Sequence, residues 1–361
     1  MVFMAGIIFV LTGFAILAID VGRIYIVRTE MQNVADSSAL AGANCLTRQT
    51  LPGSTSDCIS TTTSTLNWGI AQAKATYQLG QNTADNIAIS TTDSGHQVGT
   101  GYWNLLTGSP SGGALVNTFS PITVNDKPAV RVTVTKDTNK NNGPITMLTG
   151  KIFGGSDVPM TASAVAVISS PGNVPPSSLI PQAINKCMYD KFWNAANGTP
   201  IIYTGSPLDP YGLSVIGQPW KFRIGSAYHY DTCESGQWTS FNQDVNSQSA
   251  ISALITNGNP TTLNIGDLTW IEPGTKTASY NDLNARYPKL PVDVSIIVVD
   301  TADLTNKGTV PIVAFAGFSI DAIQGGSGKY IQGNFIANYL TPGSGGIGPF
   351  YGTYTPPRLA Q

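Results

Sequence analysis

An uncharged apolar segment at the N-terminus, Met1–Ile19, constrains this chain more than any other feature. Nineteen residues of helix span about 29 Å, close to the thickness of a bilayer core. A cleaved secretory signal would need a basic residue before the apolar run, and none precedes Arg23. A buried core helix would be shorter and amphipathic. We therefore expect a single helix that stays on the mature chain as an anchor.

The same helix is expected to continue well past the apolar segment, because no proline interrupts residues 1–43. Asp20 and Arg23 are three residues apart, a spacing that lets them pair on one helical face. Gly6 and Gly13 also share a face, where small residues let helix backbones approach closely, unless these glycines reflect only the composition of membrane helices. The candidate assembly positions on this helix are Gly6, Gly13, Asp20, Arg23, Arg28 and Glu30.

Composition excludes some functions. Only 11% of the residues are charged, against about a quarter in a typical soluble domain, and the net charge is −2. Nucleic-acid binding needs clustered Lys and Arg, and the chain has no basic run, so we expect no nucleic-acid partner. Two histidines, His96 and His229, leave little material for histidine-based catalysis or a zinc site. This balance favours an extracytoplasmic or assembled protein over a cytosolic enzyme.

Three short motifs imitate binding sites without completing them. Asp137–Gly143 is similar to a calcium loop, but its glycine falls one residue late and no Glu closes it. Gly325–Lys329 lacks the spacing of a phosphate-binding loop and the Ser or Thr after the lysine. Asp293–Ile297 (DVSII) carries an isoleucine where a DxSxS metal motif needs its second serine. We therefore expect a protein that is not an enzyme and that uses no metal or cofactor.

The cysteines indicate an oxidising compartment. Four cysteines allow three pairings, and the short loop after the long helix favours Cys45–Cys58, which would leave Cys187–Cys233. None of them forms a CxxC pair and no histidine is near in sequence, which argues against a metal site. Two disulfides predict a location outside the cytoplasm.

The first half of the chain has the pattern of helices followed by strands. Thr63–Leu79 is predicted to be a helix with Leu66, Ile70, Ala73 and Tyr77 on its buried face. Alternation of Val130, Val132 and Val134 with polar residues predicts a strand. Further strands are expected at NIAIS, QVGTGYWN and TASAVAVIS, and a short helix at Pro144–Phe153.

A proline-rich stretch, Ser169–Ser178, marks the domain boundary. After it we expect a helix at Pro181–Trp193 and then strands, in an antiparallel β or α+β domain. The predicted fold class is α+β: a long hydrophobic helix packed on an antiparallel sheet, as in pilins, followed by a second β-rich domain. The expected divisions are the helix 1–44, an α+β domain 45–170, a linker 171–178, a β-rich domain 179–340 and an extended tail 341–361.

The run Ala18–Ala43 (AIDVGRIYIVRTEMQNVADSSALAGA) resembles the N-terminal signature of the TadE/TadG-like proteins of the Flp-type (Tad) pilus machinery. Asn264–Lys276, together with VAFAGFSI and KYIQGNFI, resembles the C-terminal region of long TadG-like proteins. The family implies an inner-membrane or pilus-associated protein with its C-terminal bulk outside. The matching signature positions are Asp20, Val21, Gly22, Arg23, Gln32, Asn33, Ala35, Asp36, Ala39, Leu40, Ala41, Gly42 and Ala43.

With this resemblance, the sequence predicts a structural subunit that self-assembles through its N-terminal helix into an extracellular Tad-like pilus. Its expected partners are copies of itself, the Tad-type assembly machinery and, before assembly, the inner membrane. The alternative is a membrane-anchored accessory pilus protein or a tip adhesin that binds a surface ligand through residues 179–361. The start, Met1–Gly6, lacks the acidic residue usual early in pilins, so either a leader was removed before Met1 or the anchored protein is never processed.

Overall fold

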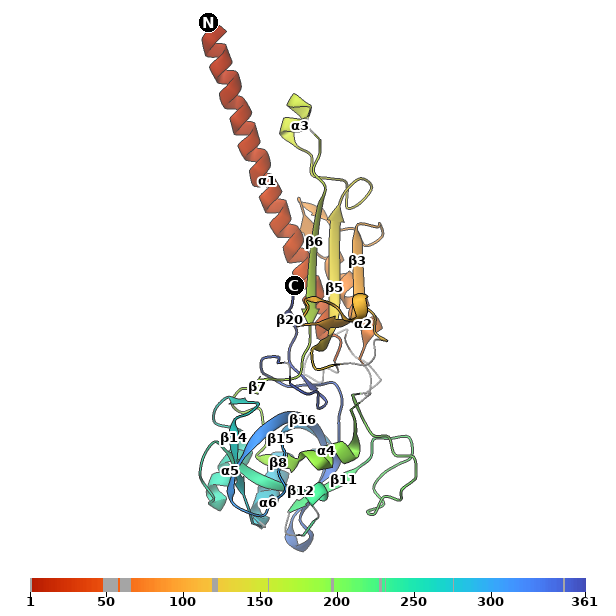
Figure 1. Cartoon of the computed structure of the whole chain (residues 1–361), viewed down its shortest axis with the longest axis vertical. Helices are drawn as coiled ribbons and strands as arrows, with labels where there is room; N and C mark the ends of the chain where they lie inside the picture. Colours follow the sequence, from red (N-terminus) through yellow and green to blue (C-terminus); the bar gives the residue numbers. More distant parts are fainter. Residues whose placement is uncertain are drawn as a thin grey trace.

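Three parts follow one another along the molecule: a long helix, a first unit built on a sheet, and a second unit built on a barrel (Figure 1). The computed structural model describes residues 2–47, 58, 66–118, 123–154, 156–195, 198–226, 229–230, 232–274, 276–346 and 348–361. Helix α1 (Val2–Asn44) projects from the first unit, and the β-rich remainder gives the α+β class expected from the sequence.

The first unit is an antiparallel sheet of order β20-β6-β5-β3-β4. The second half of α1 and helix α2 (Trp68–Gly80) pack against it. Its strands are β3 (His96–Asn104), β4 (Ser109–Pro110), β5 (Asp126–Lys136), β6 (Met160–Val167) and β20 (Arg358–Leu359). Smaller elements beside it are the hairpin β1 (Thr83–Ala84) and β2 (Ile87–Ala88), the turn η1 (Ser111–Gly113) and helix α3 (Leu148–Phe153).

Alternation along β5 places its valines as the sequence predicts. Val130, Val132 and Val134 are fully buried in the same core as Met31 of α1, whereas Arg131 is exposed. A strand turns successive side chains to opposite faces, so one face of β5 can be wholly apolar. This face is the surface on which α1 lies.

Close packing between α1 and α2 depends on small residues. A side chain at Gly42 would come within 2.8 Å of the Ala71 carbonyl oxygen and of the Ala75 methyl group. The buried face of α2 is accordingly Ala71, Ala75 and Leu79. The predicted face with Tyr77 is therefore wrong, because Tyr77 is 57% exposed. Large apolar side chains usually mark the buried face of a helix, but these two backbones are too close for them.

The second unit is a barrel of strands with helices around it. Its pairings run β11-β17-β16-β15-β8-β12 and return to β11, with β14 inserted between β12 and β16. The pairs β11–β12 and β15–β8 are parallel and the others antiparallel. The strands are β8 (Gln182–Asn185), β11 (Phe222–Ser226), β12 (Ser235–Phe241), β14 (Leu268–Glu272), β15 (Val292–Val299), β16 (Gly308–Gln324) and β17 (Tyr330–Phe335). The helices are α4 (Lys186–Phe192), α5 (Gln248–Asn257) and α6 (Thr277–Arg286), with single turns η2 (Thr232–Glu234) and η3 (Gly326–Gly328).

The helix predicted at Pro181–Trp193 begins later than expected. Gln182–Asn185 is strand β8, and all four of its residues are buried between β12 and β15. Pairing on both sides closes the barrel, which a helix at this position could not do. The helix α4 starts only at Lys186, where the Asn185 side chain caps it by accepting a hydrogen bond from the Cys187 N–H (3.1 Å).

The stretch expected to be a linker and the C-terminal tail both pack within the chain. In the linker, β7 (Asn173–Val174) pairs with β13 (Leu263–Asn264). The tail contributes β19 (Thr353–Tyr354), which pairs with β18 (Tyr339–Leu340), and then β20, which joins the first sheet beside β6. Phe350 packs against the cores of both units. A last short pair is β9 (Trp193–Asn194) with β10 (Thr199–Pro200).

Two disulfides join segments that the sheets do not. Cys45, just after α1, is bonded to Cys58, and Cys187 of α4 is bonded to Cys233 of η2. The first closes a separation of 13 residues and the second a separation of 46 residues. The second bond therefore restricts a much longer segment of the unfolded chain.

Replacing both Cys187 and Cys233 by serine should lower the free energy of unfolding by about 2–4 kcal/mol, because the unfolded chain regains the entropy of a long loop. Urea unfolding of the variant and of the oxidised wild type measures this difference. The matched control is the Cys45→Ser/Cys58→Ser double variant, which opens the shorter loop and should lose less. An unchanged midpoint for the Cys187 and Cys233 variant would contradict the prediction.

Candidate assembly helix

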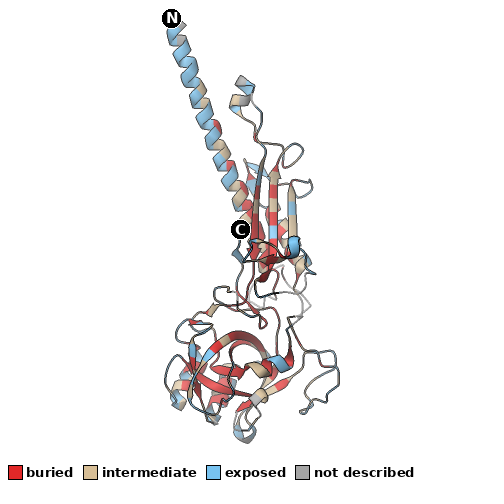
Figure 2. Cartoon of the chain, viewed as in Figure 1, coloured by how far each residue is buried: buried red, intermediate tan, exposed pale blue. Residues whose placement is uncertain are grey.

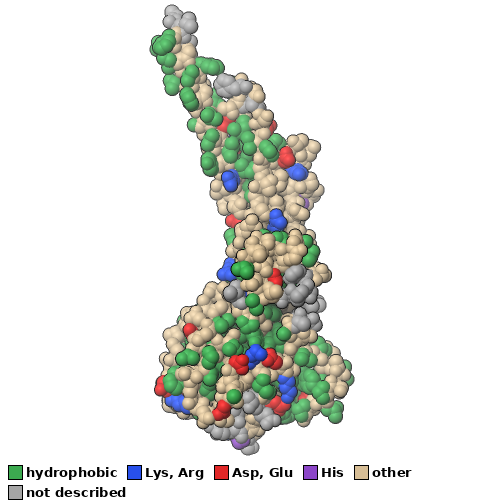
Figure 3. Space-filling view, viewed as in Figure 1, with side chains coloured by type: hydrophobic (Ala, Val, Ile, Leu, Met, Phe, Trp, Pro, Cys, Tyr) green, Lys and Arg blue, Asp and Glu red, His purple; other side chains and the backbone are tan. Residues whose placement is uncertain are grey.

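The helix α1 has two halves with different surroundings. Its first half stands clear of the body, and its exposed large apolar side chains between Phe3 and Ile19 leave 46% to 81% of their surface uncovered (Figure 2). Its second half is packed: Met31, Ala35, Ala39 and several neighbours are fully buried. Apolar side chains cover the projecting half in the space-filling view (Figure 3). In length and composition, Gly6–Asn44 could cross a membrane, and it is the one such helix in the described part of the chain.

Asp20 lies at the boundary between these halves and is fully buried. Its carboxylate accepts hydrogen bonds from the backbone N–H groups of Leu148 (2.9 Å) and Thr149 (2.7 Å) and from the Thr149 hydroxyl (2.6 Å). These N–H groups belong to the first turn of α3 and have no acceptor within that helix. Asp20 thus caps a helix that begins 128 residues further along the chain.

Arg23 and Glu30 hold the turn of the β1–β2 hairpin. The Arg23 guanidinium donates to both Asp85 carboxylate oxygens (2.9 Å each) and to the Thr146 carbonyl (3.0 Å). The Glu30 carboxylate accepts from the Asp85 backbone N–H (2.7 Å). Asp85 and Asn86 make this turn with positive φ angles of 56° and 59°, which Asp and Asn tolerate better than most residues. One helix therefore binds both the side chain and the backbone of the same turn residue.

The structure assigns the predicted helix positions to different surroundings. The spacing of Asp20 and Arg23 allows them to pair with each other, but in the structure each binds a different loop of the body. Those loops offer better partners, namely free N–H groups with a hydroxyl, and a carboxylate that can bind a guanidinium through two oxygens. Arg28 is exposed and forms no ion pair with a described residue. Gly6 is exposed, with open space where a Cβ would lie, and Gly13 is half-buried.

Sequence reasoning missed the partners of this helix. Asp85, Thr146 and Thr149 lie more than 60 residues from the side chains that bind them. The Asp85-Asn86 pair between two short apolar runs was a usable signal for a two-residue turn. Nothing in the local pattern indicated that α1 would bind it.

Two of the three motifs that imitate binding sites have structural roles. Ser319 donates a hydrogen bond to the Asp293 carboxylate (2.7 Å) in the β15–β16 pair. The backbone N–H of Asn141 donates to Asp93 (2.9 Å) and its side chain to Gly95 and Thr135, which fixes the turn after β5. In the described ranges, no three His, Cys, Asp or Glu side chains come together as metal ligands.

Asp20→Ala should release α3 from α1. Three hydrogen bonds to one carboxylate are lost, and removal of a helix cap costs about 1–2 kcal/mol. Hydrogen exchange followed by mass spectrometry should show faster exchange in residues 147–153 and unchanged exchange in β5. Asp36→Ala is the matched control, because Asp36 lies on the same helix and accepts only from Gln32 among the described contacts. Equal exchange in both variants would rule out the capping role.

Arg23 and Asp85 should be coupled energetically. A double-mutant cycle of Arg23→Ala with Asp85→Asn should give a coupling energy of about 1 kcal/mol, above the usual value for an exposed ion pair because two oxygens are bound. Asn is chosen because it tolerates the positive φ angle at position 85. Thermal unfolding of the four proteins gives the coupling, and additive effects would contradict the prediction.

Two protein-family models match the N-terminal part of the chain. Residues 1–44 match the Flp pilus-assembly TadE/G-like family model, and residues 32–166 match the Tad-like Flp pilus-assembly family model. No curated protein and no solved structure matches the chain. Asn264–Lys276 lies beyond both matched ranges, so its resemblance stays a prediction. The matched ranges cover α1 and most of the first sheet, so residues 1–166 are similar to the TadE/G-like and Tad-like Flp pilus-assembly families.

Proposed function

We propose that the chain is a structural pilus subunit that assembles with copies of itself through the projecting half of α1 into an extracellular Tad-type filament. The observation that carries this proposal is the exposed apolar surface between Phe3 and Ile19 on a chain whose residues 1–166 match Flp pilus-assembly family models. These family matches support a structural or assembly role rather than catalysis.

The apolar half of α1 needs a cover. Burying a large apolar side chain stabilises by about 1.5–3 kcal/mol, so covering the exposed ones between Phe3 and Ile19 is worth on the order of 10–20 kcal/mol. A bilayer or the same helices of neighbouring subunits can supply the cover. We propose both in sequence: the inner membrane before assembly, and neighbouring subunits after the Tad-type machinery has moved the subunit outward.

The body fixes the direction of the projecting half. Packing of Met31, Ala35 and Gly42 on the first unit sets the axis of α1, and the bonds of Asp20 and Arg23 hold it up to the point where it leaves. Identical copies thus present the helix at one angle. Repetition of one head-to-tail contact at a fixed angle produces a filament unless the rotation closes into a ring.

Shearing of cells that express the chain tests the proposal. We expect long filaments composed mostly of this chain in the sheared fraction, seen by electron microscopy and mass spectrometry. Gly13→Leu should reduce filament yield about tenfold while the inner-membrane level is unchanged, because added bulk prevents close approach of helices whose membrane insertion it does not impair. Ala15→Leu, which adds similar bulk on another face of the same segment, is the matched control.

Other outcomes of the shearing experiment identify other roles. Traces of the chain at the tips of filaments made of another protein, or retention in the inner membrane alone, would replace the proposal with an accessory protein or tip adhesin. Equal filament yield for Gly13→Leu and the wild type would remove the helix face of Gly13 from the assembly contact.

A further inference from the structure

Helix α3 has apolar side chains that the rest of the chain leaves uncovered. Leu148 is 42% exposed and Ile152 is 58% exposed, in a helix of six residues. They are four positions apart, a spacing that places both side chains on one face of the helix. Single exposed apolar residues are common on protein surfaces and need no explanation. The position of this face on the molecule is what makes it informative.

The position of α3 is fixed by α1. The Asp20 carboxylate binds the N–H groups of Leu148 and Thr149, so the first turn of α3 lies at the level where the apolar run of α1 ends. Six residues of helix are only about 9 Å long, so the rest of α3 stays close to that level. Figure 1 shows α3 beyond the ends of β5 and β6, beside the projecting half of α1.

The exposed apolar surface of α1 also extends past Asp20. Tyr25 is 66% exposed and Ile26 is 61% exposed, and both lie about 8–9 Å further along the helix. The polar layer on each side of a bilayer core is about 5–8 Å thick, and tyrosine is enriched in it. With the apolar run in the bilayer core, this polar layer therefore lies at the level of α3 and reaches close to Tyr25.

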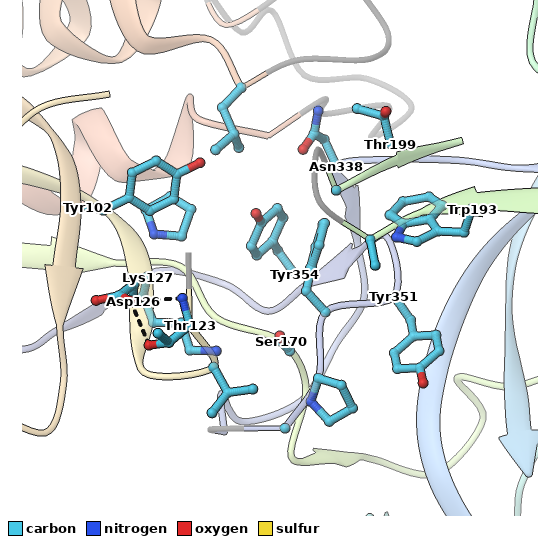
Figure 4. A pocket seen from close by; sticks show the side chains of 18 of the residues that line it. Tyr102, Thr123, Asp126, Lys127, Ser170, Trp193, Thr199, Asn338, Tyr351 and Tyr354 are labelled. Atoms are coloured by element: carbon cyan, nitrogen blue, oxygen red, sulfur yellow. Dashed lines mark hydrogen bonds between the residues drawn. The ribbon is translucent and has the colours of Figure 1, made fainter. Parts of the chain in front are cut away.

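Apolar surface at the junction of the two units is different, because aromatic rings there contact one another. Rings of both units and of the tail line an aromatic cavity of about 550 Å³, in which Figure 4 shows Tyr102, Trp193 and Tyr354. Phe350 stacks on Tyr354 with ring centroids 4.5 Å apart, and it meets Trp193 edge to face at 5.9 Å. The apolar face of α3 has no comparable cover within the described part of the chain.

A bilayer is the partner that fits this arrangement. Lipid that covers the apolar run surrounds α1 on every side, so it also reaches a helix that is bound to α1 at Asp20. A neighbouring α1 would cover one side only. Lys151 is exposed and forms no ion pair with a described residue, so its ammonium group can extend to lipid phosphates while its methylene groups stay in the apolar layer. Asp20 is buried and hydrogen-bonded, so it adds no free carboxylate at this level.

We propose that α3 inserts the face formed by Leu148 and Ile152 into the outer surface of the inner membrane before assembly. This inference rests on the inner-membrane step of the proposed function. A single spanning helix leaves the body free to rotate about the axis of that helix. A second contact through α3 fixes which side of the body faces the lipid, so every subunit in the membrane has the same orientation.

Quenching of a fluorescent label by lipids tests this proposal. The full chain is reconstituted at low density in phospholipid vesicles with an NBD label on Ile152→Cys, and the four native cysteines are bonded in pairs. Lipids with a nitroxide near the headgroup should quench this label by about half, because an interfacial helix lies about 5–10 Å deep in this layer. Leu106→Cys is the matched control, because position 106 is 80% exposed and follows the end of β3 that is remote from α3. A label there should not be quenched.

A label on Ile8→Cys reports separately whether α1 is in the bilayer. Quenching at position 8 but not at position 152 would overturn this proposal and leave the inner-membrane step of the proposed function intact. Quenching at neither position would overturn both. A blue-shifted emission at position 152 without quenching would assign the face to a neighbouring copy of the chain, and it would also overturn the proposal.

A charge on the same face provides a second test. With the label on Leu148→Cys, the further change Ile152→Glu should reduce quenching about fivefold, because a carboxylate is costly in the apolar layer. The fold should be kept, because Ile152 is exposed and the backbone N–H groups that bind Asp20 remain. Leu106→Glu is the matched control and should leave quenching unchanged. Equal quenching in both variants would show that this face does not enter the bilayer.

Discussion

Close packing of α1 on its own sheet is the contact on which the rest of the structure depends. The absence of a side chain at Gly42 lets α2 approach to 2.8 Å of where a Cβ would lie, and the small residues of the same helix face lie on the valines of β5. Because α1 continues as one helix from this packed half, its other half is directed away from the body and its large apolar side chains stay exposed. Most of the apolar positions from Met31 to Ala43 thus pack within the chain, whereas the large apolar side chains between Phe3 and Ile19 are exposed.

Polar groups at the boundary between the halves serve this arrangement. Asp20 caps α3, and Arg23 and Glu30 bind the turn at Asp85. Both of these loops are therefore attached to α1 near the point where it leaves the body. An isolated helix would need no such contacts. Because the body reaches up along α1 as far as Asp20, the projecting apolar length is close to that of a bilayer core.

Periodicity predicted much of the first unit. The apolar run and the absence of proline predicted α1, and the alternation of Val130 with Arg131 predicted β5, because both patterns are local in the sequence. Contacts between distant segments were not predictable in this way. Gln182–Asn185 forms a strand because β12 and β15 flank it. Helix α2 buries its alanines because Gly42 of α1 lies opposite them. The Asp20 carboxylate binds the first turn of α3 and does not pair with the Arg23 side chain. The aromatic cavity combines residues from 66 to 354, so no single window of sequence contains its pattern.

Strand β20 returns the end of the chain to the sheet that contains β6, and Arg358 pairs there with Val167. The barrel is therefore an insertion between the neighbouring strands β6 and β20, and two connections join it to the first sheet. Torque on the barrel acts on both connections at once, and neither backbone can swivel freely while the other is in place. Tension on the barrel also shears β6 along the eight residue pairs it makes with β5, so those hydrogen bonds share the load instead of opening one at a time.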